Sequence, residues 1–165
     1  MRRTVVGVMG GSAADARTEE NAYQLGRLIA GRGWVLLCGG KPHGVMEAVA
    51  RGAQEAGGLT VGVLYDEDRE LAGRHLDHVL PTGMGAGRNI INVLSSDVVV
   101  ACRGNGGTLS EIALAIRFQR PVVLLDFDPG RTFLETCGRG PWTLAATPAA
   151  AVEQADRYLA ELGRT

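Results

Sequence analysis

The segment RGNGGTLSE, residues 103–111, combines three glycines with a threonine and a carboxylate. A Val-rich run over residues 97–102 precedes it, and an apolar pattern with helical spacing over residues 109–116 follows it. Glycine N–H groups can approach an anion closely, and the positive end of a following helix adds to the attraction. The segment therefore predicts an anion-binding site where a strand joins a helix. Its candidate contacts are Gly104, Asn105, Gly106, Gly107, Thr108 and Glu111.

Two further glycine segments follow apolar runs, GGS at residues 10–12 and GG at residues 39–40. If these runs are parallel strands, all three glycine segments lie at one edge of a sheet, outside the carboxyl ends of its strands. A tight turn explains one such segment equally well, but three at one edge favour a phosphate-bearing ligand. The additional candidate contacts are Gly10, Gly11, Ser12, Gly39 and Gly40.

Glu111 and Arg88 are the charged residues of greatest interest. The pattern T-x-x-E from Thr108 to Glu111 is that of a capping box, in which the acid only stabilises the start of a helix. In a functional interpretation Glu111 faces the sugar or base of a ligand, because a carboxylate beside a phosphate is costly. There it holds a ribose hydroxyl or polarises water. Arg88 follows TGMGAG and begins a predicted helix, so that it either binds a phosphate or carboxylate or stays exposed.

Other ligand motifs are weak or missing in the sequence. The first glycine segment does not form G-x-G-x-x-G, the second apolar run ends without an acid, and there is no P-loop. His75 and His78 alone are poor evidence for a metal, and we expect no metal site. Cys38, Cys102 and Cys137 form no CxxC pair, which favours a reducing compartment over a disulfide framework.

Short Val-rich runs alternate with helical patterns along the chain. The expected strands cover residues 4–9, 34–38, 60–64, 97–102 and 121–126, with a short one at 78–80. The expected helices cover residues 45–56, 87–94, 109–116 and 152–162, with another from about residue 22 to residue 31. Nearly continuous apolar strands are typical of parallel sheets covered on both faces. We therefore predict an α/β fold, a doubly wound Rossmann-like parallel sheet with helices on both faces, as one domain over residues 1–165.

The composition argues against two classes of partner. The 165 residues carry a net charge of -1, which gives no basic field for nucleic acid or a membrane surface. Aromatic residues make up 5%, so the interleaved rings typical of nucleic-acid binding are missing too. No apolar stretch approaches the ~20 residues of a membrane helix, and no signal peptide is apparent. We expect a cytoplasmic protein.

Three segments together resemble a known family. GGKPHGVMEAVARGAQEAGG, then GMGAGR, then RGNGGTLSEIALAI with RPVVLL, are similar to the LONELY GUY-like Rossmann superfamily, whose members are often mislabelled as lysine decarboxylases. The resemblance covers residues 5–126 and is closest to a small bacterial branch similar to molybdenum cofactor carriers. We expect no lysine decarboxylase activity, because the only lysine, Lys41, lies in a glycine segment and no PLP site is apparent.

The resemblance also implies roles for individual residues. The enzymes of the superfamily hydrolyse nucleoside 5′-monophosphates to a free base and ribose 5-phosphate, and by position Arg88 and Glu111 match their paired arginine and acid. Gly104, Gly107 and Thr108 match their phosphate loop. Two departures bring the catalytic geometry into question. Arg103 and Asn105 replace a proline and a glycine of the phosphate loop. Met84 lies four residues before Arg88, whereas the spacing in the enzymes is usually three residues.

From these features we expect a protein that binds a phosphate-bearing nucleotide or pterin, with an AMP-like nucleotide or the molybdenum cofactor as candidate ligands. The alternative is a nucleoside 5′-monophosphate phosphoribohydrolase that uses Arg88 and Glu111. No cofactor is expected to be needed for folding. The resemblance further implies a homodimer or a dimer of dimers through helices beside the site. The small-residue face of residues 45–53 packs either against the sheet or against such a partner.

Overall fold

A seven-stranded sheet in the order β4-β3-β2-β1-β5-β6-β7 organises the chain, and all neighbouring strands are parallel. The structure is a computed structural model that describes residues 2–163. Its strands are β1 (Val5–Met9), β2 (Val35–Cys38), β3 (Leu59–Leu64), β4 (His78–Pro81), β5 (Val98–Ala101), β6 (Val122–Leu125) and β7 (Trp142–Ala145). The chain builds outward from β1 to β4 and then returns to the other side of β1, so the strand order reverses between β1 and β5.

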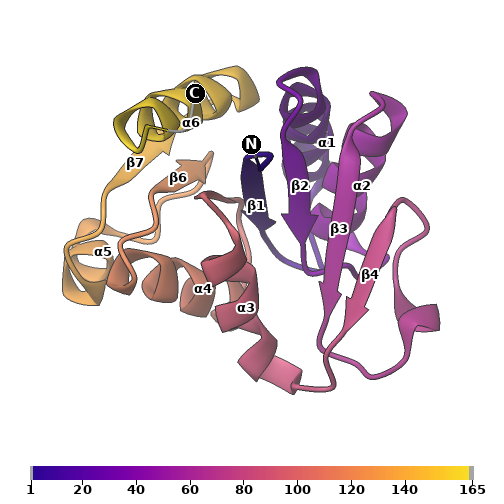
Figure 1. The fold of residues 1–165 in the computed structure, drawn as a ribbon. Helices are drawn as coiled ribbons and strands as arrows, with labels where there is room; N and C mark the ends of the chain where they lie inside the picture. Colours follow the sequence, from indigo (N-terminus) through magenta and orange to yellow (C-terminus); the bar gives the residue numbers. More distant parts are fainter. Residues whose placement is uncertain (1, 164–165) are drawn as a thin grey trace.

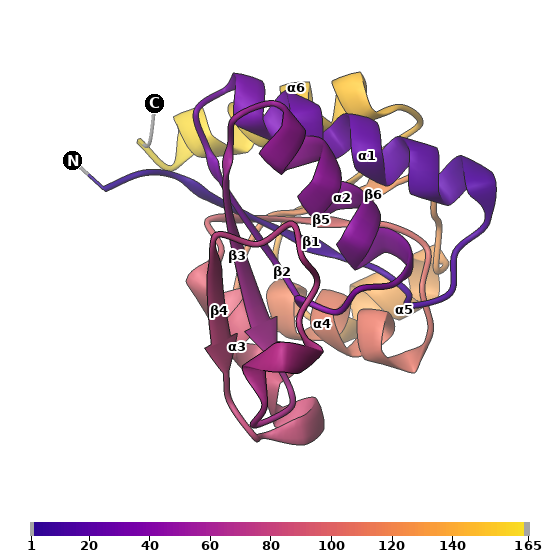
Figure 2. The same cartoon turned by 90° about the vertical axis from the view of Figure 1, so that its right-hand side faces the viewer.

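Helices cover both faces of the sheet (Figures 1 and 2). One layer contains α1 (Ala16–Gly31), α2 (Gly44–Glu55) and α6 (Pro148–Glu161). The other contains α3 (Arg88–Ser95), α4 (Gly106–Arg117) and α5 (Arg131–Cys137). Two short 3-10 helices, η1 (Arg69–Leu71) and η2 (Gly85–Gly87), lie in the loops. The predicted doubly wound α/β fold is confirmed.

The inner strands are apolar because helices cover them on both faces of the sheet. Every residue of β2, β5 and β6 is buried, with one side of the sheet packed on each helical layer. Strands buried in this way read as continuous apolar runs, which is the pattern that the sequence shows. Among residues 2–163, none of the helices has the length and apolar character needed to cross a lipid bilayer.

The C-terminal third contains two elements that the sequence pattern did not predict. Strand β7 is half-exposed at the edge of the sheet, and its Thr143 breaks the apolar run that marks the inner strands. Helix α5 has seven residues and buries only Leu134, which is too few for a visible period. The segment after Arg131 therefore completes the sheet and one helical layer.

Helix α1 begins at Ala16, earlier than predicted, because its first turn is mostly polar and is capped by Asp15.

Glycines bring α1 and α2 into close contact. A Cβ atom on Gly26 of α1 would overlap the backbone oxygen of Val49, and one on Gly52 of α2 would overlap the backbone oxygen of Tyr23. The small-residue face of residues 45–53 is thus buried against α1 and the sheet within a single chain. Of the two predicted uses of this face, packing within the chain is therefore confirmed over packing against a partner chain.

Replacing Gly26 by alanine should lower the free energy of unfolding by about 1–3 kcal/mol, because the new methyl group must push two backbones apart. Urea denaturation measures the change. Gly31→Ala, in the same helix, is the matched control, since a Cβ there meets no atom within 4 Å. It should leave stability unchanged or raise it by up to about 1 kcal/mol. Equal effects of the two substitutions would contradict the close-packing interpretation.

Candidate functional site

A cavity of about 120 Å³ opens where the strand order reverses, at the carboxyl ends of β1, β2 and β5. Ligands of open α/β sheets bind at such a reversal. All three predicted glycine segments contribute to this cavity, and α3 and α4 supply charged and polar side chains. The lining residues are Val8, Met9, Gly10, Ser12, Gly39, Met46, Arg88, Asn89, Asn105, Gly107, Thr108 and Glu111.

Four predicted contacts, Gly11, Gly40, Gly104 and Gly106, are not among the lining residues. The amide of Gly11 donates to the carbonyl of Arg103 at 3.1 Å, which ties the first glycine segment to the third. A Cβ on Gly104 would overlap the Thr108 hydroxyl and crowd the Gly11 nitrogen. Gly11 and Gly104 thus let two loops meet behind the cavity.

The capping-box interpretation of Thr108 and Glu111 is wrong. Helix α4 begins at Gly106, its N-cap is Asn105, and the Asn105 side chain accepts from the Gly107 amide at 3.2 Å. Glu111 therefore lies beyond the first turn, where it cannot reach back to the cap. Asn105, which replaces a family glycine, acts as the helix cap as well as lining the cavity.

Arg88 is 7% exposed, so the predicted alternative of a solvent-exposed arginine is also wrong. Its Nη1 donates to the carbonyl of Val63 at 2.8 Å, and its guanidinium lies 5.5 Å from the centre of the Tyr65 ring. A Cβ on Gly39 would overlap Nη1, so glycine at this position gives the guanidinium its space. The Nε atom is buried and has no partner within the described residues 2–163. A buried arginine with unused donors is costly unless a ligand satisfies them.

Glu111 is also 7% exposed, and its Oε1 accepts from Asn92 Nδ2 at 2.8 Å. Burial raises the pKa of this carboxyl to about 7, although the Asn92 hydrogen bond and the positive charge of Arg88 both act in the opposite direction. Near neutral pH the group is therefore divided between its acid and its carboxylate. The neutral acid removes much of the expected cost of placing Glu111 beside an anion.

Each of the two charged side chains keeps one terminal atom for a ligand. Arg88 Nη2 and Glu111 Oε2 have no hydrogen-bond partner among residues 2–163, and neither is sealed from solvent as Arg88 Nε is. Both residues line the cavity. The amides of Gly106 and Thr108, at the start of α4, are likewise unpaired within the described residues. The site thus offers donors suited to an anion beside one carboxyl oxygen.

Asn89 and Asn92 on α3 belong to the site, although the sequence motifs did not indicate them. Asn89 donates to Ser110 Oγ at 2.9 Å and lines the cavity, whereas Asn92 is fully buried against Glu111. Together with Arg88 they give this short helix a polar buried face, while Ile90 and Ile91 are only half-buried. A helical period read from apolar residues alone assigns the wrong side of α3 to the core, and the two asparagines were the available signal.

The lysine and the histidines do not line the cavity. Lys41 pairs with Asp66 at 2.9 Å, and His43 is exposed at the start of α2. His75 contacts Gln54 and Glu47 rather than His78, which is in β4. Within residues 2–163, no three His, Cys, Asp or Glu side chains are grouped so as to hold a metal ion.

The chain matches the model of a protein family and is similar to solved structures. The model of the SLOG cluster4 family matches residues 3–152. The molybdenum cofactor binding protein of Rippkaea orientalis is 44% identical, with a TM-score of 0.91 over 96% of this chain and 99% of that one. The molybdenum cofactor carrier protein of Chlamydomonas reinhardtii is 39% identical, with a TM-score of 0.89 over the same shares.

A curated relative carries a different activity in its name. The cytokinin riboside 5′-monophosphate phosphoribohydrolase of Mycobacterium tuberculosis is 35% identical over 143 residues, which cover 79% of this chain and 76% of the relative. The resemblance inferred from the sequence motifs is confirmed by these matches. They include both the carriers and the hydrolases that the motifs indicated.

Glu111→Gln should stabilise the protein above pH 7. The folded-state pKa of Glu111 is about 7 and the ordinary value is 4.5, so the folded protein holds this proton more tightly than the unfolded chain. Ionisation in the folded state therefore costs up to about 3 kcal/mol at high pH, a cost that shrinks below pH 7 and is lost below about pH 4.5. Unfolding free energies of variant and wild type should diverge with that pH dependence. Glu153→Gln, on the exposed side of α6, controls for loss of a surface charge, and a pH-independent difference at Glu111 would contradict the assignment.

Proposed function

This chain belongs to the SLOG cluster4 family, and we propose that it is a carrier that binds a small phosphate-bearing nucleotide or pterin cofactor at the carboxyl edge of its sheet. One observation carries the proposal. The buried guanidinium of Arg88 keeps an Nη2 group that is open to solvent and unpaired within residues 2–163, and Arg88 lines a cavity that also receives the N-terminus of α4. Such an arrangement suits a phosphate group. The close structures named as molybdenum cofactor binding and carrier proteins support the pterin as a candidate ligand.

The size of the cavity favours holding one end of the ligand. At about 120 Å³ it is well below the roughly 300–1,000 Å³ of pockets that enclose a drug-sized molecule. A phosphate fits inside, beside Arg88 and Thr108 at the start of α4. The flat ring of a nucleotide or pterin then rests outside, over the strand ends. A ligand held mainly by its phosphate is suited to being passed on, which agrees with a carrier.

Hydrolysis of a nucleoside 5′-monophosphate is the second candidate, favoured by the shared opening of Arg88 Nη2 and Glu111 Oε2 into one cavity. Arg88 would anchor the phosphate. Glu111 would take a proton from water as that water attacks the ribose C1′, and the bond to the base would break with its electrons leaving on the base. That proton would then pass to the base, giving free base and ribose 5-phosphate. A carboxyl pKa of about 7 suits a group that accepts and returns a proton near neutral pH.

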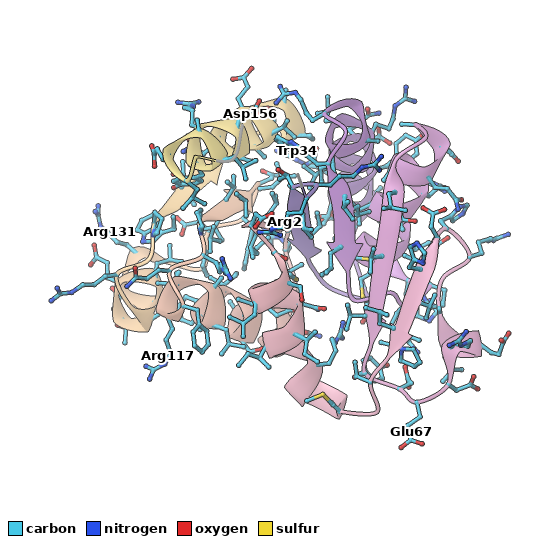
Figure 3. The ribbon with its side chains drawn as sticks, viewed as in Figure 1. Arg2, Trp34, Glu67, Arg117, Arg131 and Asp156 are labelled. Atoms are coloured by element: carbon cyan, nitrogen blue, oxygen red, sulfur yellow. The ribbon has the colours of Figure 1, made fainter. Side chains whose placement is uncertain are left out.

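A second copy of the chain is proposed to cover the outer face of α3. Ile90 and Ile91 are half-buried and Leu94 is 44% exposed, although the opposite side of this helix is polar and buried. Phe118 continues the apolar surface at the end of α4, and Arg117 extends outward from that helix (Figure 3). This inverted helix favours placing the homodimer that the sequence resemblance implies at α3 and α4 rather than at α2.

A ligand panel tests the binding proposal. AMP, ribose 5-phosphate and the molybdenum cofactor should each be screened for a rise in melting temperature, which binding to the native state produces by mass action. Arg88→Gln should weaken binding of the phosphate ligands at least about tenfold, because it removes a charge-assisted contact. Arg131→Gln, an exposed arginine on α5, is the matched control. Failure of the wild type to bind any of these ligands would overturn the proposal.

Chromatography of the same AMP incubations separates the two functions. Under the carrier proposal AMP remains intact with the wild type. Release of adenine by the wild type, and its loss in Glu111→Gln, would instead establish the hydrolase. That result would replace the carrier as the main activity.

Leu94→Glu tests the proposed dimer. A charge at this position should disrupt an apolar contact and convert a dimer into a monomer, measured by light scattering during gel filtration. Leu28→Glu, on the exposed side of α1, is the control and should leave the dimer intact. A monomeric wild type at micromolar concentration, or a dimer that survives Leu94→Glu, would contradict the assignment of this face.

A further inference from the structure

Asn92 is fully buried in the structure, although its side chain is an amide. Its position is fixed by the polar buried face of α3, four residues after Arg88. Burying an amide is costly unless hydrogen bonds compensate for lost water. Within residues 2–163 the one hydrogen bond of this side chain is donated by Nδ2 to Glu111 Oε1 at 2.8 Å, and Oδ1 is buried without a partner. The amide therefore donates a hydrogen bond to Glu111, although its own oxygen gains no hydrogen bond in return.

The two oxygens of Glu111 are consequently in different environments. Oε1 is occupied by the Asn92 donor, whereas Oε2 has no partner within residues 2–163 and stays open to solvent on a residue that lines the cavity. We infer that Asn92 is a positioning residue, which holds Oε1 and so fixes Oε2 as the oxygen that Glu111 presents to a bound ligand. This inference rests on the proposed function of the cavity, because it concerns how Glu111 meets what binds there.

The arrangement decides what Glu111 can do in each protonation state. With an N–H group directed at Oε1, the proton of the neutral acid resides on Oε2, so Glu111 presents an O–H donor to an oxygen of the ligand. In the ionised state Oε2 presents a lone pair, which accepts from a hydroxyl or from water. Asn92 thus makes one carboxyl oxygen serve both states, whether the ligand is carried or cleaved.

Glu111 is the group that titrates in this part of the site. The ionisable residues coupled to it are Arg88 on α3 and Cys38 on β2. Burial raises the pKa of the Cys38 thiol to about 11, so it stays protonated between pH 5 and 9. The Asn92 hydrogen bond lowers the pKa of Glu111 against the larger effect of burial. Removing the amide should therefore move the Glu111 midpoint to higher pH.

Asn92→Leu tests the inference, since leucine has similar volume and no donor. Binding of ribose 5-phosphate should be measured from pH 5 to 9, together with the pH dependence of unfolding. The wild type should lose affinity as Glu111 ionises, and the variant should bind at least about tenfold more weakly at pH 6, because Oε2 is no longer fixed. Its pH midpoint should lie about one unit higher. The titration of the phosphate itself is common to both proteins and cancels in the comparison.

Two further variants separate positioning from packing. Ser96→Ala removes the bond that Ser96 Oγ donates to the backbone oxygen of Asn92 at 2.7 Å, within the same stretch of chain. It should lower stability and leave the pH midpoint unchanged. Asn92→Asp is nearly isosteric and places a second carboxyl beside Glu111, so it should raise the midpoint even if Asn92→Leu does not fold.

The outcomes for the inference and for the proposed function are distinct. A wild type that binds no phosphate ligand would overturn the function, whereas the midpoint of the unfolding profile still reports on Asn92 and Glu111. An unchanged midpoint in folded Asn92→Leu or Asn92→Asp would overturn the positioning role. An equal midpoint shift in Ser96→Ala would do so as well, because the effect would then come from packing alone.

Discussion

Burial of one carboxyl group beside one guanidinium is the constraint on which the site depends. Glu111 and Arg88 each retain 7% exposure, and neither has a full set of protein partners. Because charges are expensive to bury, the site relaxes by favouring neutral Glu111 and leaves Arg88 as its one fixed charge. The result is a net preference for an anion. The reversal of strand order provides the location, since the chain leaves β1 and β5 for helices on opposite faces of the sheet there.

Much of the architecture was predictable, since inner parallel strands and their connecting helices follow simple patterns of burial. The sequence-based predictions were incomplete or wrong for elements that are only partly buried or that bury polar side chains. Strand β7 lies at an edge, α5 is short, and α3 buries Arg88 and Asn92 while exposing Leu94. Spacing alone also misplaced the start of α4, because an asparagine in a glycine segment is itself a good N-cap. Whether Glu111 caps a helix or faces a cavity depends on that one residue.

The carrier and hydrolase hypotheses share the same recognition chemistry. Both need Arg88 and the start of α4 for a phosphate, and they differ in what Glu111 does when the ligand is present. As a neutral acid it donates a hydrogen bond and holds the ligand. As a carboxylate it accepts a proton and begins a reaction. Proteins with each of the two names are among those similar to this chain.

The most direct measurement is a carbon-13 NMR titration of the Glu111 side-chain carboxyl, assigned by its loss in Glu111→Gln, with and without AMP. A midpoint near pH 7 that rises further on adding AMP is the predicted result, because a bound anion favours the neutral acid. A midpoint near the ordinary value of 4.5, unchanged by AMP, would mean that Glu111 is neither desolvated nor next to a bound anion. That outcome would contradict the account of the site given above.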